Sequence, residues 1–118
     1  MQIIFDEKLV PQLRERHVVL ELDTVLQPDM EKPLTLFALV DVGLGELLQL
    51  PVLIQQHEEM IELYKQGDWD KAEGAAYALK GQWRGEIDEF YDSAIELINE
   101  YRNSNTIWDG IRHSVPKD

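Results

Sequence analysis

Hydrophobic and polar residues alternate over the first part of the chain, which is the spacing of β-strands. In residues 17–26 one face includes Glu21 and Asp23 and the other is apolar, the apolar positions being Val18, Leu20 and Leu22. A second apolar run covers residues 34–42, and the short loop between the runs holds two prolines around Asp29, a composition typical of turns. We therefore expect an antiparallel hairpin of strands 17–26 and 34–42.

This hairpin needs further support, because two strands alone are only marginally stable in water. The support can come from helices, from a third strand at residues 2–5, or from a second copy of the chain. Just before the hairpin the sequence favours a short helix capped by Asp6. Pro11 is tolerated only in a first turn, so this helix should begin near Val10.

The second half of the chain places apolar residues three or four positions apart, which is helical spacing. Three segments share this pattern, with acidic residues on the opposite face: residues 51–66, 69–80 and 84–102. Gly67 can end the first helix in a left-handed conformation, and Asp68 can cap the second.

These elements predict an α+β fold in a single domain of residues 1–118. The short helix and the hairpin occupy residues 1–45, and they pack on a three-helix unit in residues 46–118.

The turn between the first two helices has a distinctive composition, carried by Tyr64, Gly67, Asp68, Trp69 and Ala72. Over residues 63–79 this pattern resembles the inter-helix turn of a tetratricopeptide repeat. Small residues there let two antiparallel helices approach, and an aromatic ring fills the end of the gap. No second copy occurs at a period of about 34 residues, and the positions that depart from the family pattern are Gln56, Met60 and Ala76. The resemblance implies one helical hairpin and no repeat array.

A longer resemblance covers residues 62–91. Its most distinctive part runs Leu-x-Gly-x-Trp-x-Gly-Glu-x-Asp-x-Phe-Tyr, from Leu79 to Tyr91. This pattern is similar to that of small uncharacterised proteins of marine tailed phages, including cyanophages. The resemblance implies a viral origin, a location in the host cytoplasm and no known activity.

Composition excludes several classes of protein. The formal net charge of −12 argues against direct binding of DNA or RNA, which depends on Lys and Arg neutralising phosphates. The chain has no cysteine, so disulfides, thiolate metal sites and cysteine nucleophiles are excluded. No apolar run is long enough to cross a membrane, and no basic region precedes the apolar N-terminus as in a signal peptide. We expect a soluble cytoplasmic protein that does not associate with membranes.

Candidate catalytic and metal-binding groups lack the spacing that such sites require. Glu58 and Glu62 lie one helical turn apart and could reach a hard cation together with Asp88, but solvated acidic faces are common on helices. No Glu is followed by a His three residues later, as a di-iron helical bundle needs. His57 lies on an apolar stripe, the position of a core histidine with one hydrogen bond. We predict no catalytic residue, cofactor or metal ligand.

The best candidate for an interaction surface lies around Trp83. This residue stands between Gly81 and Gly85 in a connection between helices, where its side chain could be exposed, and exposed tryptophans are typical of interface hot spots. The acidic helix that follows adds charge to the same region. The surface predicted from the sequence therefore consists of Trp83, Glu86, Glu89 and Asp92.

Three functional hypotheses follow. The favoured one is a non-catalytic protein-interaction or scaffold module with a protein partner, because the chain has an acidic helical surface and no catalytic set. The first alternative is a nucleic-acid mimic that blocks a DNA- or RNA-binding protein, which requires a continuous stripe of acids. The second is a small metal-dependent enzyme built on helix carboxylates. Pairing of two copies through open hairpin edges would give a homodimer.

Overall fold

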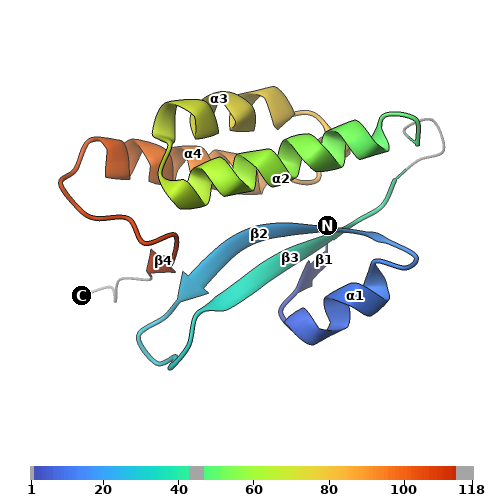
Figure 1. The fold of residues 1–118 in the computed structure, drawn as a ribbon, viewed down its shortest axis with the longest axis horizontal. Helices are drawn as coiled ribbons and strands as arrows, with labels where there is room; N and C mark the ends of the chain where they lie inside the picture. Colours follow the sequence, from blue (N-terminus) through green and yellow to red (C-terminus); the bar gives the residue numbers. More distant parts are fainter. Residues whose placement is uncertain (1, 43–46, 114–118) are drawn as a thin grey trace.

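The computed structural model describes residues 2–42 and 47–113 and shows an α+β fold in which the helices mostly follow the strands (Figure 1). The expected division between residues 45 and 46 falls outside the described residues. The strands are β1 (Gln2–Ile4), β2 (Val18–Leu26), β3 (Leu34–Val40) and β4 (Arg112–His113). The α-helices are α1 (Val10–Leu13), α2 (Leu50–Gln66), α3 (Trp69–Leu79) and α4 (Asp88–Arg102), and the 3₁₀ turns are η1 (Glu7–Leu9) and η3 (Trp83–Gly85).

The predicted hairpin is confirmed and forms the centre of a four-stranded sheet with the order β1-β3-β2-β4. β1 pairs antiparallel with β3, with Ile4 opposite Phe37. β4 pairs parallel with β2, with Val25 opposite Arg112. The hairpin thus gains a strand from each end of the described chain.

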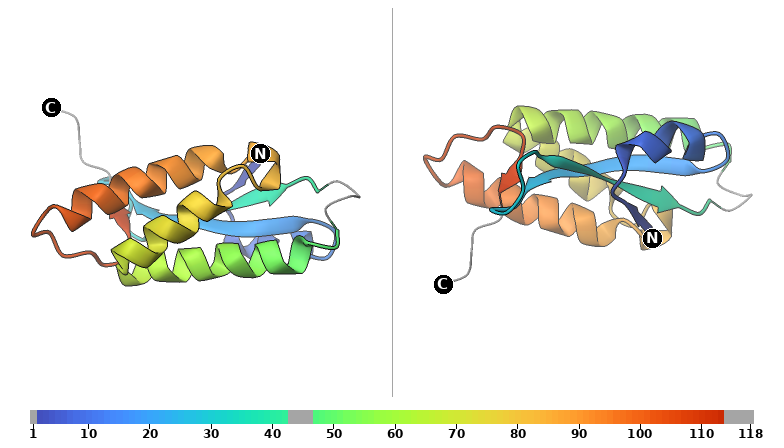
Figure 2. Two further views of the ribbon diagram at one scale, coloured as in Figure 1. Left: turned by 90° about the horizontal axis from the view of Figure 1, so that it is seen from above. Right: turned by 90° about the horizontal axis from the view of Figure 1, so that it is seen from below.

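The helices cover the two faces of the sheet unequally. α2 and α4 lie on one face, α3 rests on both of them farther from the sheet, and α1 lies on the opposite face (Figures 1 and 2). The main core cluster combines the α2-facing side chains of the hairpin with α2, α3 and α4. A small second cluster lies under α1 and consists of Val10, Val19 and Phe37.

A β-bulge in β2 changes which side chains face the core. Glu21 pairs with Phe37 and Thr24 pairs with Thr35, so β2 has one more residue than β3 in this interval. As a result Leu22 and Asp23 are both buried. The alternation predicted Asp23 on the face opposite Leu22, and this was wrong because the bulge interrupts the two-residue period.

The third long helix begins later than its apolar spacing predicts. Trp83 and Arg84 have φ angles of 55° and 57°, and Gly85 has a φ of 74°. Three successive left-handed residues cannot lie within a right-handed helix. Residues 83–85 therefore form a separate turn, and α4 begins at Asp88 instead of residue 84.

The turn after α2 has the predicted left-handed glycine, whereas Asp68 stands at the N-cap of α3 without a capping hydrogen bond from its side chain. Gly67, with a φ of 78°, ends α2, and its amide donates to the carbonyls of Leu63 and Tyr64. α3 then runs back along α2, which gives the helical hairpin expected from residues 63–79. Small buried side chains, Ala72 and Ala76, allow this close approach.

The segment after α4 returns to the sheet and fastens the two layers together. Trp108 lies 5.5 Å from Tyr64, 5.8 Å from Trp69 and 4.9 Å from Tyr101 between ring centroids. Its indole Nε1 donates a hydrogen bond of 2.9 Å to the carbonyl of Tyr64. The chain then enters β4 beside β2.

Candidate functional site

The four residues of the surface predicted around Trp83 differ in their exposure in the structure. Trp83 itself is only 3% exposed and belongs to the main core cluster, so the expectation of an exposed hot spot was wrong. The left-handed turn of residues 83–85 directs this side chain inward, which its glycine neighbours did not reveal. Glu86 is half-buried, while Glu89 and Asp92 are exposed on α4.

The exposed part of this surface continues along α4. Glu89, Asp92 and Glu96 are three and four residues apart, so they share one stripe of the helix, and all three are exposed. We call these three residues the α4 acidic stripe. Lys80 lies 2.6 Å from Asp92, and within the described residues Glu89 and Glu96 have no ion-pair partner.

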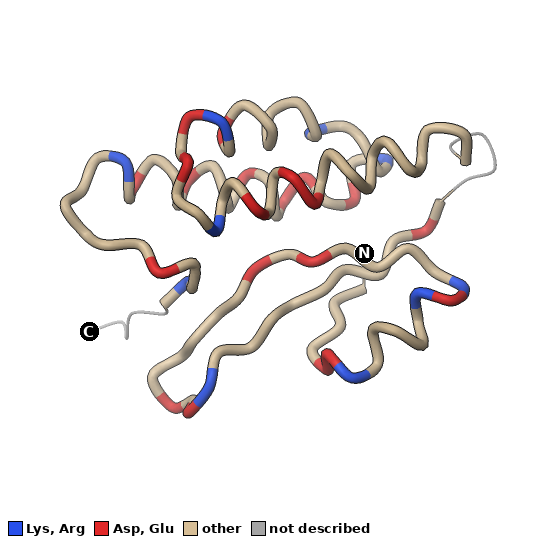
Figure 3. The backbone as a smooth tube through the Cα atoms, in the orientation of Figure 1, with Lys and Arg blue, Asp and Glu red and all other residues tan. Residues whose placement is uncertain are grey.

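Acidic residues also occur on α2, on α3 and on the hairpin, interspersed with Lys and Arg near α1 and the hairpin tip (Figure 3). In the described ranges, no group of three or more His, Asp or Glu side chains is placed to hold a metal ion. The predicted pair Glu58 and Glu62 lies on the exposed face of α2.

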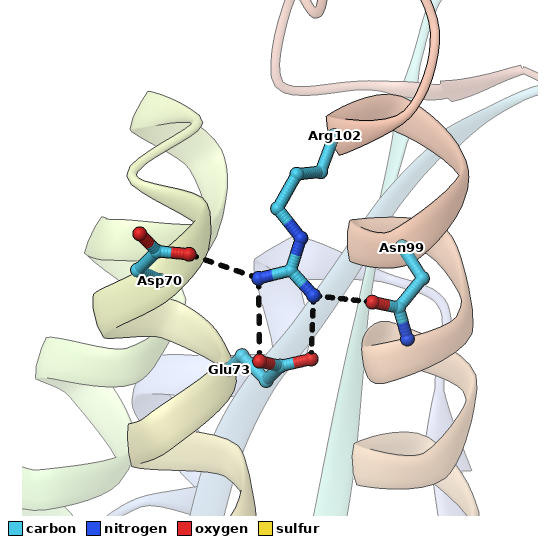
Figure 4. A network of polar contacts seen from close by, with 4 residues as sticks. All are labelled: Asp70, Glu73, Asn99 and Arg102. Atoms are coloured by element: carbon cyan, nitrogen blue, oxygen red, sulfur yellow. Dashed lines mark hydrogen bonds and ion pairs between the residues drawn. The ribbon is translucent and has the colours of Figure 1, made fainter.

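One surface network joins α3 to α4. The guanidinium of Arg102 binds Asp70 at 2.9 Å and Glu73 at 2.9 and 3.2 Å, and it also donates to the side chain of Asn99 (Figure 4). These four residues are tied to one another across the two helices. The network therefore stabilises the helical layer and leaves little of this cation for a ligand.

A second polar cluster lies inside the molecule and joins β2, α2, α4 and β4. Asp23 is 7% exposed; its Oδ1 accepts from the Tyr64 hydroxyl at 2.8 Å and its Oδ2 from Arg112 Nε at 2.9 Å. Arg112 Nη2 also donates to the Tyr64 hydroxyl at 3.3 Å and to the Ser93 carbonyl at 3.4 Å. Burial, followed by the charge of Asp23, raises the pKa of Tyr64 far above its ordinary value. We call Asp23, Tyr64 and Arg112 the buried triad.

His57 forms the other buried polar contact, between α2, α4 and β2. It is fully buried, and its Nε2 lies 2.6 Å from the Glu21 carbonyl, which can only accept, so Nε2 carries the proton. Nδ1 then accepts from the Tyr91 hydroxyl at 2.8 Å. Burial lowers the pKa of His57, although the carbonyl and the charge of Glu21 act in the opposite direction. The ring is therefore neutral, and both nitrogens are occupied.

The first of two notable surface grooves runs along the edge of β2 beside α2 and has a volume of about 580 Å³. Side chains already occupy this edge: Arg14 Nη2 donates to the Val19 carbonyl at 3.3 Å, and His57 donates to that of Glu21. Lys65 forms an ion pair with the carboxylate of Glu21. β1 pairs with residues 37–39 of β3 and β4 pairs with Val25 and Leu26 of β2, so parts of both hairpin edges are paired within the chain. Homodimerisation itself stays a prediction.

The second groove, of about 760 Å³, lies between the hairpin tip and the end of α4. Its walls are mostly apolar, including Leu34, Leu36 and Leu97, and its lining continues to Tyr101 and Thr106. Local sequence patterns do not predict this groove, because it forms only where the segment after α4 meets the hairpin.

Sequence reasoning also missed the buried triad. Arg112 lies 89 residues from Asp23 in the chain, so no local spacing connects them. The sequence holds one signal of this cluster, which is the charged residue Asp23 within the apolar run of β2.

Comparisons with protein-family models, with curated proteins and with solved structures gave no match to this chain. Among the described residues, none of the helices combines the length and the apolar character needed to cross a membrane.

Proposed function

We propose that this protein is a non-catalytic protein-interaction module that binds a partner with a basic surface through the α4 acidic stripe. The observation that carries the proposal is the arrangement of Glu89, Asp92 and Glu96, which are exposed together on one face of a well-packed helix. A rigid row of carboxylates presents a fixed pattern of charge, which raises association rates and selects basic partners.

The state of the buried ionisable groups favours a binding role over catalysis. Asp23, Tyr64 and Arg112 bind one another, and both nitrogens of His57 have partners. A general base needs a free lone pair within reach of a substrate proton. The hydrogen bonds of these side chains join the sheet to the helices.

The distribution of charge favours a basic protein partner over the alternative of nucleic-acid mimicry. A mimic needs a continuous path of acids, whereas here acids lie on α2, α3 and α4 and on the hairpin, with cations among them (Figure 3). The three stripe acids of α4 form one row, about 11 Å long at 1.5 Å per residue. A row of this length matches a small cluster of Lys and Arg side chains on the surface of a partner protein.

The test is a binding experiment with two matched variants. The α4 variant carries Glu89→Gln, Asp92→Asn and Glu96→Gln, and the control carries Glu58→Gln, Glu59→Gln and Glu62→Gln on the exposed face of α2. Both lose three charges. Tagged wild-type chain and both variants are used to capture proteins from a lysate of the source cell, followed by quantitative mass spectrometry.

The proposal expects a stoichiometric partner that the wild type and the α2 control retain, that the α4 variant loses, and whose capture weakens as salt rises. Equal capture by both variants would contradict the role of the stripe. A measured catalytic turnover by the purified chain would contradict the proposal as a whole. We place the interaction in the cytoplasm, and in the host cytoplasm if the gene lies among phage genes; imaging of a tagged chain and the genome neighbourhood test these points.

A further inference from the structure

The groove between the hairpin tip and α4 lies beside an unusually exposed isoleucine. Six apolar or aromatic residues line the groove: Phe5, Val25, Leu34, Leu36, Leu97 and Tyr101. Thr106 lies at its rim, and the next residue, Ile107, is 90% exposed. The protruding side chain of Ile107, which we call the knob, and the groove therefore lie next to each other at one end of the molecule.

Hydrogen bonds and ring contacts hold the segment that carries Ile107. The Ser104 hydroxyl lies 3.3 Å from the Tyr101 carbonyl, and the Thr106 amide donates to the same hydroxyl at 3.2 Å. On the other side, Trp108 is fixed against Tyr64 by its indole hydrogen bond. Because both neighbours are anchored, Ile107 is presented in a defined position, which lowers the entropy lost when a partner buries it.

The charges around this surface favour a second copy of the same chain as the occupant. In a protein of net charge −12, residues 103–108 carry no charged side chain and neither do residues 33–40, which form the loop and one wall of the groove. Two acidic chains repel one another least where such surfaces meet. The charged residues of the groove lining are of both signs, Glu100 and Arg112, so a basic partner gains no advantage here.

The available area also suits a dimer. A stable interface buries about 800 Å² on each partner, roughly a tenth of a small protein's surface. The total accessible surface is 7835 Å², so an interface of that size would cover about a tenth of it.

We propose that two copies of this protein associate end to end about a two-fold axis, with Ile107 of each copy inserted into the groove of the other. A two-fold contact is self-complementary, so knob and groove must lie on the same patch, as they do here. None of the three stripe residues lines the groove, and the hairpin contributes to it through the side chains of Val25, Leu34 and Leu36.

The first experiment measures the average mass of purified chains by sedimentation equilibrium over a range of concentrations. The wild type should rise from 13.7 kDa toward twice that value. Ile107→Asp should weaken association by about 30-fold or more, the effect of losing a central anchor. The matched control is Leu48→Asp, because Leu48 is 95% exposed and does not line this groove. The control should associate within about twofold of the wild type.

The proposal would be overturned by a wild type that stays monomeric up to about 1 mM, a concentration at which even weak dimers are populated. It would also be overturned if Ile107→Asp left the dimer intact, or if Ile107→Asp and Leu48→Asp weakened association equally. Circular dichroism of each variant verifies its fold, and exposed positions such as 107 and 48 tolerate the change. Neither residue belongs to the stripe, so partner capture can succeed or fail independently.

A second experiment maps the contact. Because the chain has no cysteine, Ile107→Cys provides a unique site for a benzophenone cross-linker. Mixing ¹⁵N-labelled and unlabelled chains distinguishes cross-links between copies from those within one copy. Inter-chain cross-links to Leu34, Leu36 or Leu97 are expected, whereas cross-links only within one chain, or only to another face of the partner, would refute the proposed geometry.

Discussion

Replacing Arg112 with methionine tests the buried triad most directly. The change keeps a long side chain but removes the cation that neutralises Asp23, whose side chain is only 10% exposed. Tyr64 would remain as the donor to Asp23 Oδ1, and Oδ2 would lose its charged donor. The folded state would then hold a buried carboxylate with one hydrogen bond in place of two.

The expected cost follows from the geometry. A hydrogen bond to a charged group contributes about 1.5–3 kcal/mol, and removing one partner of a fully buried ion pair costs about 3–5 kcal/mol. The side chain of Arg112 is 30% exposed, so water can enter and solvate Asp23 in its absence. We therefore expect Arg112→Met to lower the free energy of unfolding by about 2–3 kcal/mol.

Urea unfolding, followed by circular dichroism and tryptophan fluorescence, measures this cost. The matched control is Arg16→Met, since Arg16 is exposed and the change should alter stability by less than about 0.5 kcal/mol. A double-mutant cycle with Asp23→Asn separates the pairing from the loss of each side chain. The double variant should be less destabilised than the sum of the single variants by about 1–2 kcal/mol.

Two results would refute this reasoning. If Arg112→Met costs less than about 1 kcal/mol, the ion pair is solvated and does not join the layers. If the effects of the two substitutions simply add, Asp23 and Arg112 do not depend on each other.

Three further predictions concern other parts of the fold. Because burial lowers the pKa of His57 below its ordinary value of 6.5, the unfolded chain binds a proton at His57 that the folded chain does not. The free energy of unfolding should therefore fall as the pH drops below 6.5, by up to about 1.4 kcal/mol per pH unit, and His57→Gln should flatten this slope in urea titrations. Trp69→Ala should cost about 2–3 kcal/mol in the same assay, because the half-buried ring packs against Tyr101 and Trp108, and a loss below about 1 kcal/mol would contradict that packing. Gly67→Ala should destabilise the protein by about 1 kcal/mol or more, because the φ of Gly67 is 78° and the added Cβ would lie 3.4 Å from Trp108. Gly74→Ala should instead stabilise it by up to about 1 kcal/mol, because Gly74 is exposed within α3. Thermal melts that rank the two variants in the other order would refute the account of this turn.

The parts of the fold that the sequence predicted depend on local signals. The two strands of the hairpin and the first two long helices follow from apolar periodicity, and Gly67 ends α2 as expected. The start near Val10 also follows from a local rule, because Pro11 stands in the first turn of α1. Each signal lies within a few residues of the element that it defines.

The parts that the sequence did not predict depend on long-range contacts or on rare backbone conformations. β4 has only two residues, and its pairing with β2 brings Arg112 to Asp23 across 89 positions of the chain. The bulge turns Asp23 inward, and the left-handed Trp83 turns its own side chain inward, against the usual preference of residues other than glycine. For the candidate site, Glu89 and Asp92 were placed on the surface correctly, whereas the groove and Ile107 acquire their relationship only in the folded chain.

The pairing of Asp23 with Arg112 has a consequence for the order in which the chain matures. During synthesis Asp23 emerges 89 residues before Arg112, and Tyr64 emerges 48 residues before it. The hairpin can form early because its contacts are local, but the nascent chain cannot neutralise its inward carboxylate until the last described strand has been made. A ribosome that stalls before this point would release a loosened, protease-sensitive intermediate. The contact that neutralises Asp23 is therefore among the last of the described contacts that the growing chain can make.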